Sequence, residues 1–361
     1  MSEPEWRVAR RATLLEFPFH LAGACRRLVR EFRRRRQWQQ PAKGARQVIS
    51  GSLVDWGMFG AVVLAGMAAD FVAQRAGRTR TRGDALVRSA LWIGLGLLFS
   101  GWIALRQGSD AGVTYLTAYL LEKSLSVDNL FLFVLIFAQT GIPAALQVRA
   151  LFWGVIGALV MRAVMIALGV YLLERFHWVI YPFAGILLIS AWRMLFAKEA
   201  ETKLVEASCA LCTSWVGRIL PIRPYTTGPS FFVRERGRLM ATPLLVALVV
   251  IETTDLIFAV DSIPAVLAVT RDPFIVYTSN VFALLGLRSL YFVLSGAIRD
   301  LRYLRPGLGL MLLFVAVKML VGDSVHVPAW TSLLVIALIF GAAIGMSLLW
   351  PDPQRRSKGA G

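Results

Sequence analysis

The chain contains 361 residues, of which 57% are hydrophobic, and its mean hydropathy is +0.62. Ordinary soluble domains contain about 45 to 50% apolar residues, so this composition excludes that class. The formal net charge of +17 comes largely from the first segment of the chain and from loops, which favours contact with anionic lipid headgroups over contact with nucleic acid.

Long apolar segments recur along the chain. A helix of about 20 apolar residues crosses a hydrocarbon core about 30 Å thick, and these segments are apolar all round rather than along one stripe. The sequence therefore predicts an all-α polytopic membrane protein. We place about nine spans, at residues 56–74, 86–105, 115–138, 148–171, 178–196, 243–269, 277–297, 307–321 and 330–350.

The spans divide the chain into six predicted parts. The only long connection between spans carries charges and a Pro/Gly-containing run, so we expect it to be a solvated linker. The parts are a basic N-terminal extension (1–50), two leading spans (51–110), a first membrane repeat (111–197), the linker (198–242), a second membrane repeat (243–322) and a last span with a basic tail (323–361).

Loops rich in Lys and Arg alternate with loops that contain almost none, and this difference predicts the orientation. Residues 75–88, the linker, residues 298–306 and the C-terminal tail are basic, whereas 272–276 and 322–329 are nearly free of positive charge. The linker and the C-terminus are therefore predicted to be cytoplasmic, and the N-terminus external.

An arginine cluster at residues 26–46 conflicts with an external N-terminus, because such a cluster resists translocation. Three explanations stay open. The segment returns to the cytoplasmic face as an interfacial helix, an extra crossing exists, or the true start lies further along the chain.

Two of the predicted spans each contain more than one acidic residue, and each such residue costs about 2.5 kcal/mol or more near the centre of a membrane helix. The third span has Glu122 and Asp128, and the sixth has Glu252, Asp255 and Asp261. The two stretches align, with Glu122 on Asp255 and Asp128 on Asp261. Because three spans separate the copies, the sequence predicts an inverted three-plus-three helix repeat, which is typical of secondary transporters with a site at the repeat interface.

Carboxylate and amide oxygens are the ligands that hard divalent cations such as Mn²⁺, Mg²⁺ or Ca²⁺ prefer. Pro264 adds to this chemistry, because its ring frees the carbonyl oxygen of Val260 beside Asp261. We expect no tightly bound cofactor, only a transported or bound cation. The predicted metal ligands are Glu122, Asp128, Asn129, Glu252, Asp255 and Asp261.

Two alternatives to metal binding stay open. The acids could form structural ion pairs with intramembrane cations, or they could form a proton path without metal. The cations available for such pairs are Lys123, Arg162, Arg193, Arg288 and Lys318.

Other motifs are weaker. Cys209 and Cys212 form a single Cys-x-x-Cys in the linker, which by itself specifies neither a zinc site nor a redox role. The sequence contains no phosphate-binding loop, nucleophile elbow or dinucleotide fingerprint, so we expect no enzymatic activity.

Several segments closely resemble the TerC family of membrane proteins. They are Glu122 to Asn129, Phe258 to Ala265, Thr270 to Val276 and Thr278 to Asn280, together with Phe231 to Arg234 and Ala241 to Leu244 in and after the linker. The resemblance covers roughly residues 50 to 350. The arginine-rich first 50 residues depart from the common pattern.

The resemblance implies a bacterial inner-membrane protein with about nine spans, linked to tellurium resistance and, in the related Alx proteins, to manganese export. The family's intramembrane acids correspond here to Glu122, Asp128, Asp255 and Asp261, with Glu252 at a position that is usually acidic.

The leading hypothesis is therefore a divalent metal transporter that exports Mn²⁺ by alternating access of the two repeats. The alternative is a membrane scaffold or metal-delivery protein that acts in tellurium resistance and the envelope stress response, with the linker 198–242 as the surface for cytoplasmic partners. A third hypothesis is a thiol oxidoreductase that uses Cys209 and Cys212.

Overall fold

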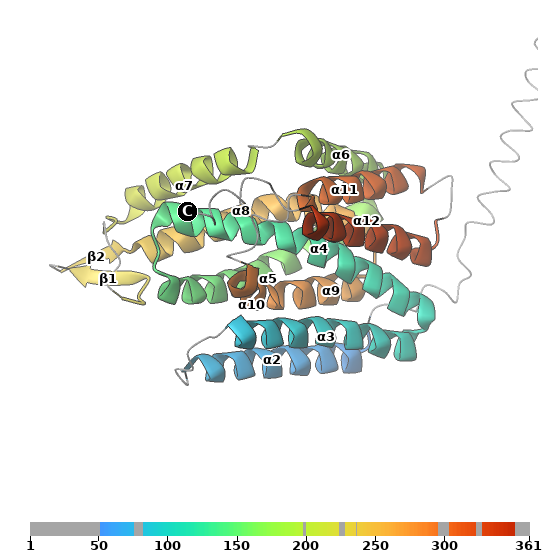
Figure 1. Ribbon diagram of the computed structural model, residues 1–361, viewed down its shortest axis with the longest axis horizontal. Helices are drawn as coiled ribbons and strands as arrows, with labels where there is room; N and C mark the ends of the chain where they lie inside the picture. Colours follow the sequence, from blue (N-terminus) through green and yellow to red (C-terminus); the bar gives the residue numbers. More distant parts are fainter. Residues whose placement is uncertain are drawn as a thin grey trace, which may run out of the picture. The chain divides into compact units, whose positions relative to one another are not determined.

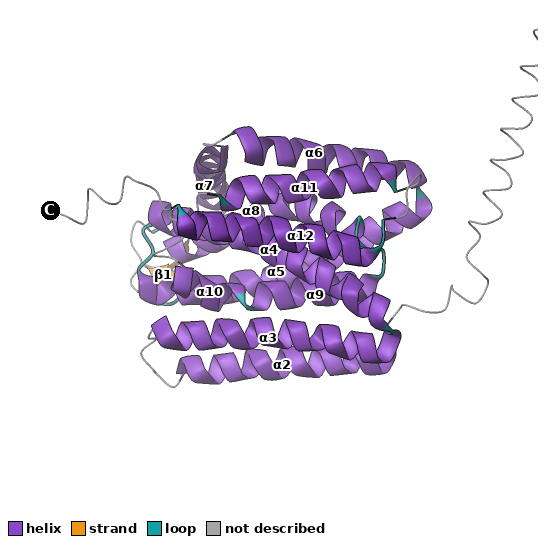
Figure 2. Ribbon diagram, turned by 45° about the vertical axis from the view of Figure 1, so that its right-hand side comes forward, coloured by secondary structure: helices purple, strands orange, loops and turns teal. Residues whose placement is uncertain are grey.

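Long helices that lie alongside one another make up most of the structure (Figures 1 and 2). The computed structural model describes residues 51–75, 82–197, 200–223, 228–235, 237–294, 303–322 and 327–350. The helices are α2 (Leu53–Arg75), α3 (Arg82–Gln107), α4 (Ser109–Thr140), α5 (Ala144–Arg175), the short 3₁₀ helix η2 (His177–Val179), α6 (Ile180–Phe196), α7 (Ala200–Ile219), α8 (Pro243–Leu267), α9 (Pro273–Leu285), α10 (Leu287–Leu294), α11 (Leu304–Val321) and α12 (Ala329–Leu349).

Each of the nine predicted spans overlaps a helix or, at η2–α6 and at α9–α10, two consecutive helices. Within the described ranges, seven helical segments are long and apolar enough to cross a membrane. The apolar part of α2 is shorter, Leu53–Ala69, and α4 has 32 residues but carries Glu122, Lys123 and Asp128 in its middle. A polytopic all-α membrane protein is therefore confirmed, whereas crossings by α2 and α4 stay predictions.

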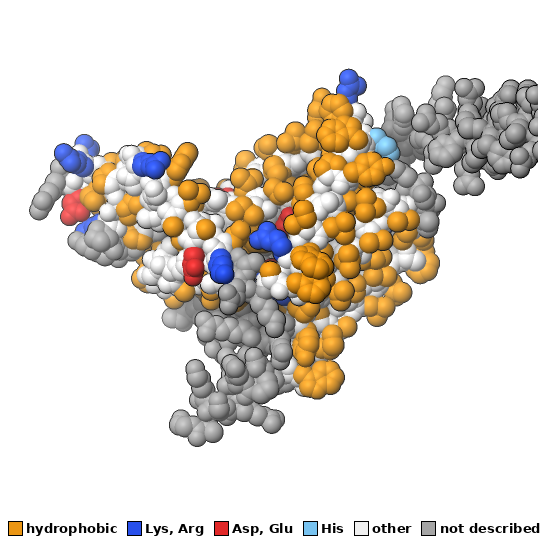
Figure 3. Space-filling model, turned by 90° about the horizontal axis from the view of Figure 1, so that it is seen from above, with side chains coloured by type: hydrophobic (Ala, Val, Ile, Leu, Met, Phe, Trp, Pro, Cys, Tyr) orange, Lys and Arg blue, Asp and Glu red, His pale blue; other side chains and the backbone are white. Residues whose placement is uncertain are grey.

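The outer surface suits a lipid environment. Apolar side chains dominate the right-hand part of the face in Figure 3, and the charged side chains on this face are few. Large hydrophobic side chains such as Trp192, Leu338 and Leu348 are 65%, 63% and 71% exposed. An apolar surface this extensive is rare on soluble monomers, so its contact with acyl chains follows naturally.

The central helix is α4, which packs against α3, α8, α9 and α12. It ends at Gly141, whose φ of 64° lies in the left-handed region that glycine adopts easily. The turn that follows leads through Pro143 into α5. Because neighbours surround α4, its charged residues lie inside the protein rather than against lipid.

The helices pair in a regular way. α5 packs on α8, α4 packs on α9, and α6 packs on α11, while α4 and α8 contact each other and run in opposite directions (Figure 1). This pairing is the one expected if α4 to α6 correspond to α8 to α11 as two inverted copies. The inverted repeat itself stays a prediction.

The segment predicted to be a solvated linker is largely folded. α7 packs on α8 and α4, with Val205 and Cys212 buried against them, and the Cys212 thiol contacts the Thr253 hydroxyl at 3.6 Å. A two-stranded antiparallel hairpin follows, β1 (Phe232–Glu235) and β2 (Arg238–Ala241). The interpretation as a simple linker is therefore incomplete, because one face of α7 is buried against the bundle.

Aromatic side chains attach α2 to the rest of the bundle. Trp56 packs edge-on against Phe274 of α9, with ring centroids 5.0 Å apart, and the ring centroids of Phe59 and Phe282 lie 5.8 Å apart.

The arginine cluster at 26–46 and the basic tail at 351–361 lie outside the described residues.

Candidate functional site

Arg162 of α5 lies where α4, α5 and α8 meet, and it is only 1% exposed. Its Nη1 donates to Glu122 Oε2 at 3.0 Å, while Nε and Nη2 donate to the two carboxylate oxygens of Asp255 at 3.3 and 3.1 Å. Nη1 also donates to the Ser262 hydroxyl at 3.3 Å. One guanidinium therefore joins the acidic motif of α4 to that of α8.

The charges of Arg162, Glu122 and Asp255 do not sum to zero. Glu122 is 1% exposed and Asp255 is 6% exposed, so both carboxylates share the buried environment of Arg162. In their ordinary ionised states the cluster has two negative charges and one positive charge. Because an uncompensated charge costs several kcal/mol in such an environment, the cluster favours a further cation or a proton.

Glu252 lies one turn before Asp255 on α8 but has a different neighbour. A methyl group added at Gly157 of α5 would collide with the Glu252 carboxylate, so this carboxylate rests directly on the glycine. The side chain is half-buried. Glu252 and Asp255 therefore both face α5, as their predicted shared helix face requires. Glu252 contacts Gly157, whereas Asp255 pairs with Arg162.

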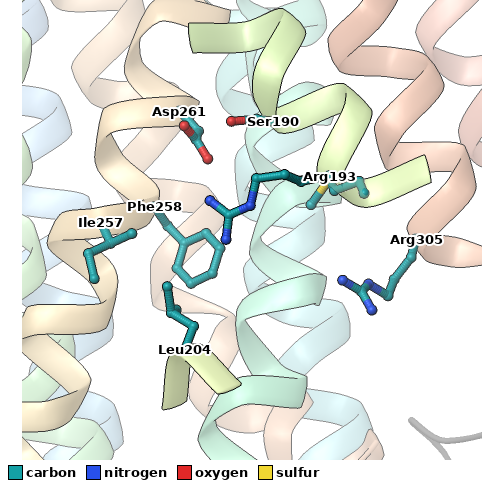
Figure 4. A pocket seen from close by; sticks show the side chains of 8 residues that line it. Ser190, Arg193, Leu204, Ile257, Phe258, Asp261 and Arg305 are labelled. Carbon is teal, nitrogen blue, oxygen red and sulfur yellow. The ribbon is translucent and has the colours of Figure 1, made fainter. Parts of the chain in front are cut away.

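Asp261 lies in a small cavity between α6, α7, α8 and α11 (Figure 4). The cavity has a volume of about 40 Å³ and is lined by Asp261, Ser190, Arg193, Arg305 and apolar side chains. The Asp261 carboxylate faces the Ser190 hydroxyl and interacts with the Arg193 guanidinium. This acid is therefore separate from the Arg162 cluster and closer to the surface of the bundle.

The helix around Asp261 is continuous. α8 extends to Leu267, so Pro264 lies within it and does not end it. The helix therefore stays wound on both sides of Pro264. Any role of the carbonyl that Pro264 leaves without a donor stays a prediction.

Asp128 and Asn129 are buried further along α4, at 3% and 5% exposure. Lys123, which precedes them, points toward α9, where its Nζ donates to the Ala283 carbonyl at 3.1 Å. The lysine therefore contributes to the contact between α4 and α9, and Arg162 is the cation that pairs with Glu122.

The structure brings together two of the six predicted ligands, Glu122 and Asp255, through Arg162. In the described part of the chain, no three His, Cys, Asp or Glu side chains converge closely enough to hold a metal ion. A cation bound by several of the acids therefore requires a rearrangement of Arg162 or of the helices. Metal binding by these residues stays a prediction.

Two polar residues contribute more to the site than the sequence alone indicates. Arg162 is one of five candidate cations in the sequence, yet it joins the two acidic motifs in the structure. The free-energy cost of an arginine in the middle of an apolar span is the sequence signal that could have singled it out. Asn280 of α9 is 1% exposed and interacts with Glu122, although in the sequence it stands out only as part of a family motif.

Comparisons with known proteins agree with this architecture. The profile of the integral membrane protein TerC family matches residues 107–356. An uncharacterized membrane protein of Myxococcus xanthus is 46% identical over 295 residues, which are 81% of this chain and 92% of the relative. No solved structure matches the chain.

Two other relatives have more specific names. A protein of Salmonella typhi named as a candidate membrane-bound redox modulator, Alx, is 40% identical over 318 residues, covering 85% of this chain and 98% of its own length. The chloroplast thylakoid membrane protein TERC of Arabidopsis thaliana is 41% identical over 260 residues, which are 72% of this chain and 67% of that protein. The chain belongs to the TerC family of integral membrane proteins.

Proposed function

We propose that the protein carries hard divalent cations across the membrane, with Mn²⁺ as the first candidate and export as the expected direction. The observation behind this proposal is the buried cluster of Glu122, Arg162 and Asp255, which has one more negative than positive charge. Apolar side chains would pack these helices at least as well, because buried ion pairs seldom stabilise more than hydrophobic contacts of similar volume. Charged groups retained inside a membrane mark ion and proton pathways.

In this mechanism the Arg162 guanidinium pairs with Glu122 and Asp255 when no metal ion is bound. An arriving cation competes with it for the carboxylate oxygens, which are ligands that Mn²⁺ and Mg²⁺ prefer. Carboxylates that release a metal ion can take up protons, so proton antiport is the natural coupling. The opposed directions of α4 and α8 support alternating access of two halves around the cluster.

Asp261 and Asp128 extend the proposed route beyond the central cluster. Asp261 lines a cavity near the surface of the bundle, and Asp128 is buried in α4. A cation that met Asp261 first would have to compete with Arg193, as it competes with Arg162 deeper in the protein. A metal ion would thus replace an arginine as the partner of a carboxylate at two places along the route.

The deciding experiment is Mn²⁺ flux in proteoliposomes, with and without a pH gradient. Asp128→Asn, Asp255→Asn and Asp261→Asn should each reduce flux at least tenfold, because each removes a charged oxygen ligand from the route. Asp110→Asn, at an exposed position in the first turn of α4, is the matched control and should leave flux unchanged. Full flux in both Asp128→Asn and Asp261→Asn would contradict the proposal.

A scaffold or metal-delivery protein is the second candidate. One face of α7 carries the exposed apolar side chains Leu211, Trp215 and Ile219, at 62%, 63% and 69% exposure and one turn apart. Such a stripe suits a partner protein in tellurium resistance or envelope stress. Wild-type protein that binds Mn²⁺ through the acids but transports none would favour this candidate over the carrier.

Thiol chemistry is less well supported. Cys209 and Cys212 are free thiols, and Cys212 is buried. Burial, together with the neighbouring Cys212, raises the pKa of the Cys209 thiol. Because the thiolate is the reactive form, a raised pKa disfavours thiol exchange at neutral pH. This cysteine pair therefore gives little support to the redox role that the name of the Alx relatives states.

We also propose a bacterial inner-membrane location with the linker and the C-terminus in the cytoplasm. The α4–α5 turn and the β1–β2 hairpin lie at the same end of the bundle as the last turn of α2 and the first turn of α3 (Figure 1). The basic loops predicted to be cytoplasmic thus begin or end on one side, which supports the positive-inside assignment.

A further inference from the structure

Unpartnered polar atoms gather at the contact between α4 and α9. Asn280 of α9 is 1% exposed, and in the described chain neither its amide oxygen nor its amide nitrogen has a partner at ordinary hydrogen-bond distance and angle. Oε1 of Glu122 and the hydroxyl of Ser126 on α4 are also buried without one. Each such atom costs about 1 to 3 kcal/mol when left unmatched, so a group of them needs an explanation.

Three observations connect these atoms. The Asn280 side chain lies within hydrogen-bonding reach of the Glu122 carboxylate. Ser126 follows Glu122 by four residues, so both lie on the same face of α4. Lys123 Nζ donates to the carbonyl of Ala283, which places the turn of α9 after Asn280 directly against this part of α4.

Neighbouring polar residues of α9 do not share this property. The Thr278 hydroxyl donates to the Phe274 carbonyl at 2.6 Å, and the Ser279 hydroxyl donates to the Val276 carbonyl at 3.1 Å. Both residues are fully buried, but both satisfy their donors within their own helix. Asn280 therefore differs from them, because its amide extends toward Glu122 on α4 and has no partner within its own helix.

We propose that Asn280 Oδ1, Glu122 Oε1 and Ser126 Oγ form an oxygen-ligand site for a hard divalent cation between α4 and α9. The inference rests on the proposed transport function, because it specifies ligands for that cation. A carboxylate, an amide carbonyl and a hydroxyl are all hard oxygen donors, and none is a soft ligand that would favour zinc or copper.

The geometry of Arg162 allows Glu122 to serve this site. Arg162 reaches Glu122 through a single hydrogen bond to Oε2, whereas it holds Asp255 through two. Its hold on Asp255 is therefore retained if Glu122 turns toward a cation. Glu122 would exchange one cationic partner for another, while Asp255 continues to balance the arginine.

The contacts of the two acidic helices support this assignment. α5 packs on α8 and supplies Arg162 to Asp255, and α9 packs on α4 and supplies Asn280 to Glu122. Each acid that aligns in the repeat thus faces one polar side chain from the helix packed against it. On α5 that side chain is a permanent cation, whereas on α9 it is a neutral oxygen ligand that leaves room for a mobile cation.

The test is Mn²⁺ binding by the purified full-length protein in detergent, read from the loss of the electron paramagnetic resonance signal of free aqueous Mn²⁺. Asn280→Leu, which keeps the volume but removes the oxygen, should weaken binding at least tenfold. Ser126→Ala should weaken it several-fold. Ser279→Ala is the matched control and should bind as the wild type does, because that hydroxyl is satisfied within α9.

A fourth variant keeps the inference falsifiable if Asn280→Leu fails to fold. Asn280→Asp retains an oxygen at the same position, so it should bind Mn²⁺ at least as tightly as the wild type. Loss of binding in a folded Asn280→Asp protein would mean that the amide N–H is required, and it would overturn the assignment. Wild-type binding in folded Asn280→Leu would also overturn it.

Flux measured on the same variants separates the two proposals. Wild-type protein that binds Mn²⁺ in an Asn280-dependent way but transports none would retain the site and reject the carrier. Equal transport and binding by the wild type and Asn280→Leu would retain the carrier and reject the site. No Mn²⁺ binding by the wild type would reject the site.

Discussion

Arg162 shows why residue identity matters at the central cluster. Its planar guanidinium has five donors in a fixed arrangement, and four of its contacts reach two carboxylates and a hydroxyl on two helices. A lysine has a single ammonium group and could not hold both oxygens of Asp255 while reaching Glu122 on another helix. The arginine thus sets the relative positions of the two acidic motifs.

Asp272 gives a prediction on pH dependence at the residue scale. It is the N-cap of α9, and its Oδ1 accepts from the Phe274 and Ile275 N–H groups at 2.8 and 3.4 Å. Burial raises the pKa of this carboxyl from 3.8 to about 6, partly offset by those N–H donors. Since the folded state then holds the proton more tightly than the unfolded state, this contribution to stability is full below pH 3.8 and is lost as the pH rises through 6.

Asp272→Asn keeps a cap acceptor but does not titrate. Its melting temperature should therefore rise relative to the wild type as the pH is raised from 4.5 to 8. Asp272→Ala, which removes the cap, should lose about 1 kcal/mol. Asp110→Asn serves as the exposed control. A constant difference between Asp272→Asn and the wild type across this pH range would contradict the assignment.

At the scale of helices, two glycines decide how closely α5 approaches α8. A methyl group at Gly154 would lie 2.9 Å from Ile251, and one at Gly157 would collide with the Glu252 carboxylate. Small residues let helix backbones come together inside membranes. This close contact is what brings Arg162 within reach of Asp255.

Gly157→Leu should therefore separate α5 from α8. Overpacking of this kind costs about 1 to 3 kcal/mol, and it should also reduce Mn²⁺ flux because Arg162 and Asp255 move apart. Gly185→Leu in α6 is the control, since a methyl group there meets nothing within 4 Å. Melting temperature and flux are the measurements, and equal values for the two variants would refute the role of Gly157.

For the whole molecule, the decisive question is whether α4 crosses the membrane despite its charges. Neighbouring helices enclose its middle, so Glu122, Lys123 and Asp128 are buried in protein and do not face lipid. Polar residues are tolerated in a membrane on that condition. We therefore predict that the two ends of α4 lie on opposite sides.

Single cysteines at the two ends test this prediction in a background with Cys25, Cys209 and Cys212 replaced by serine. Ser109 and Ala145 are both exposed, Ser109 as the first residue of α4 and Ala145 just after its end. A membrane-impermeant maleimide should label Ala145→Cys only from the cytoplasmic side and Ser109→Cys only from the opposite side. Labelling of both from one side would rule out the crossing.

Much of the fold could be predicted because a membrane span has a local signature. Most predicted spans match helices to within about four residues, as at 243–269 against α8 and 330–350 against α12. Length and hydropathy are properties of consecutive residues, so one sequence suffices. The linker was harder, since α7 is amphipathic and only its packing on α8 and α4 distinguishes it from a solvated segment.

The candidate site could be predicted only in part. Carboxylates inside apolar spans stand out by their cost, and the matched spacing of Glu122 and Asp128 with Asp255 and Asp261 is visible in the chain. Their partners are not, because Arg162 is 40 residues from Glu122 and 93 from Asp255. A single buried asparagine in an apolar span gives no comparable signal.

The amino-acid sequence by itself determined that this is a polytopic helical membrane protein with two acidic motifs, because burial of helical segments in lipid depends on local hydrophobicity. Only the tertiary structure decided which charges meet. It placed Arg162 between Glu122 and Asp255, put Asp261 in a separate cavity, and set Asn280 against Glu122. These pairings depend on how helices pack across long separations in the chain, where glycines and buried polar groups select one arrangement.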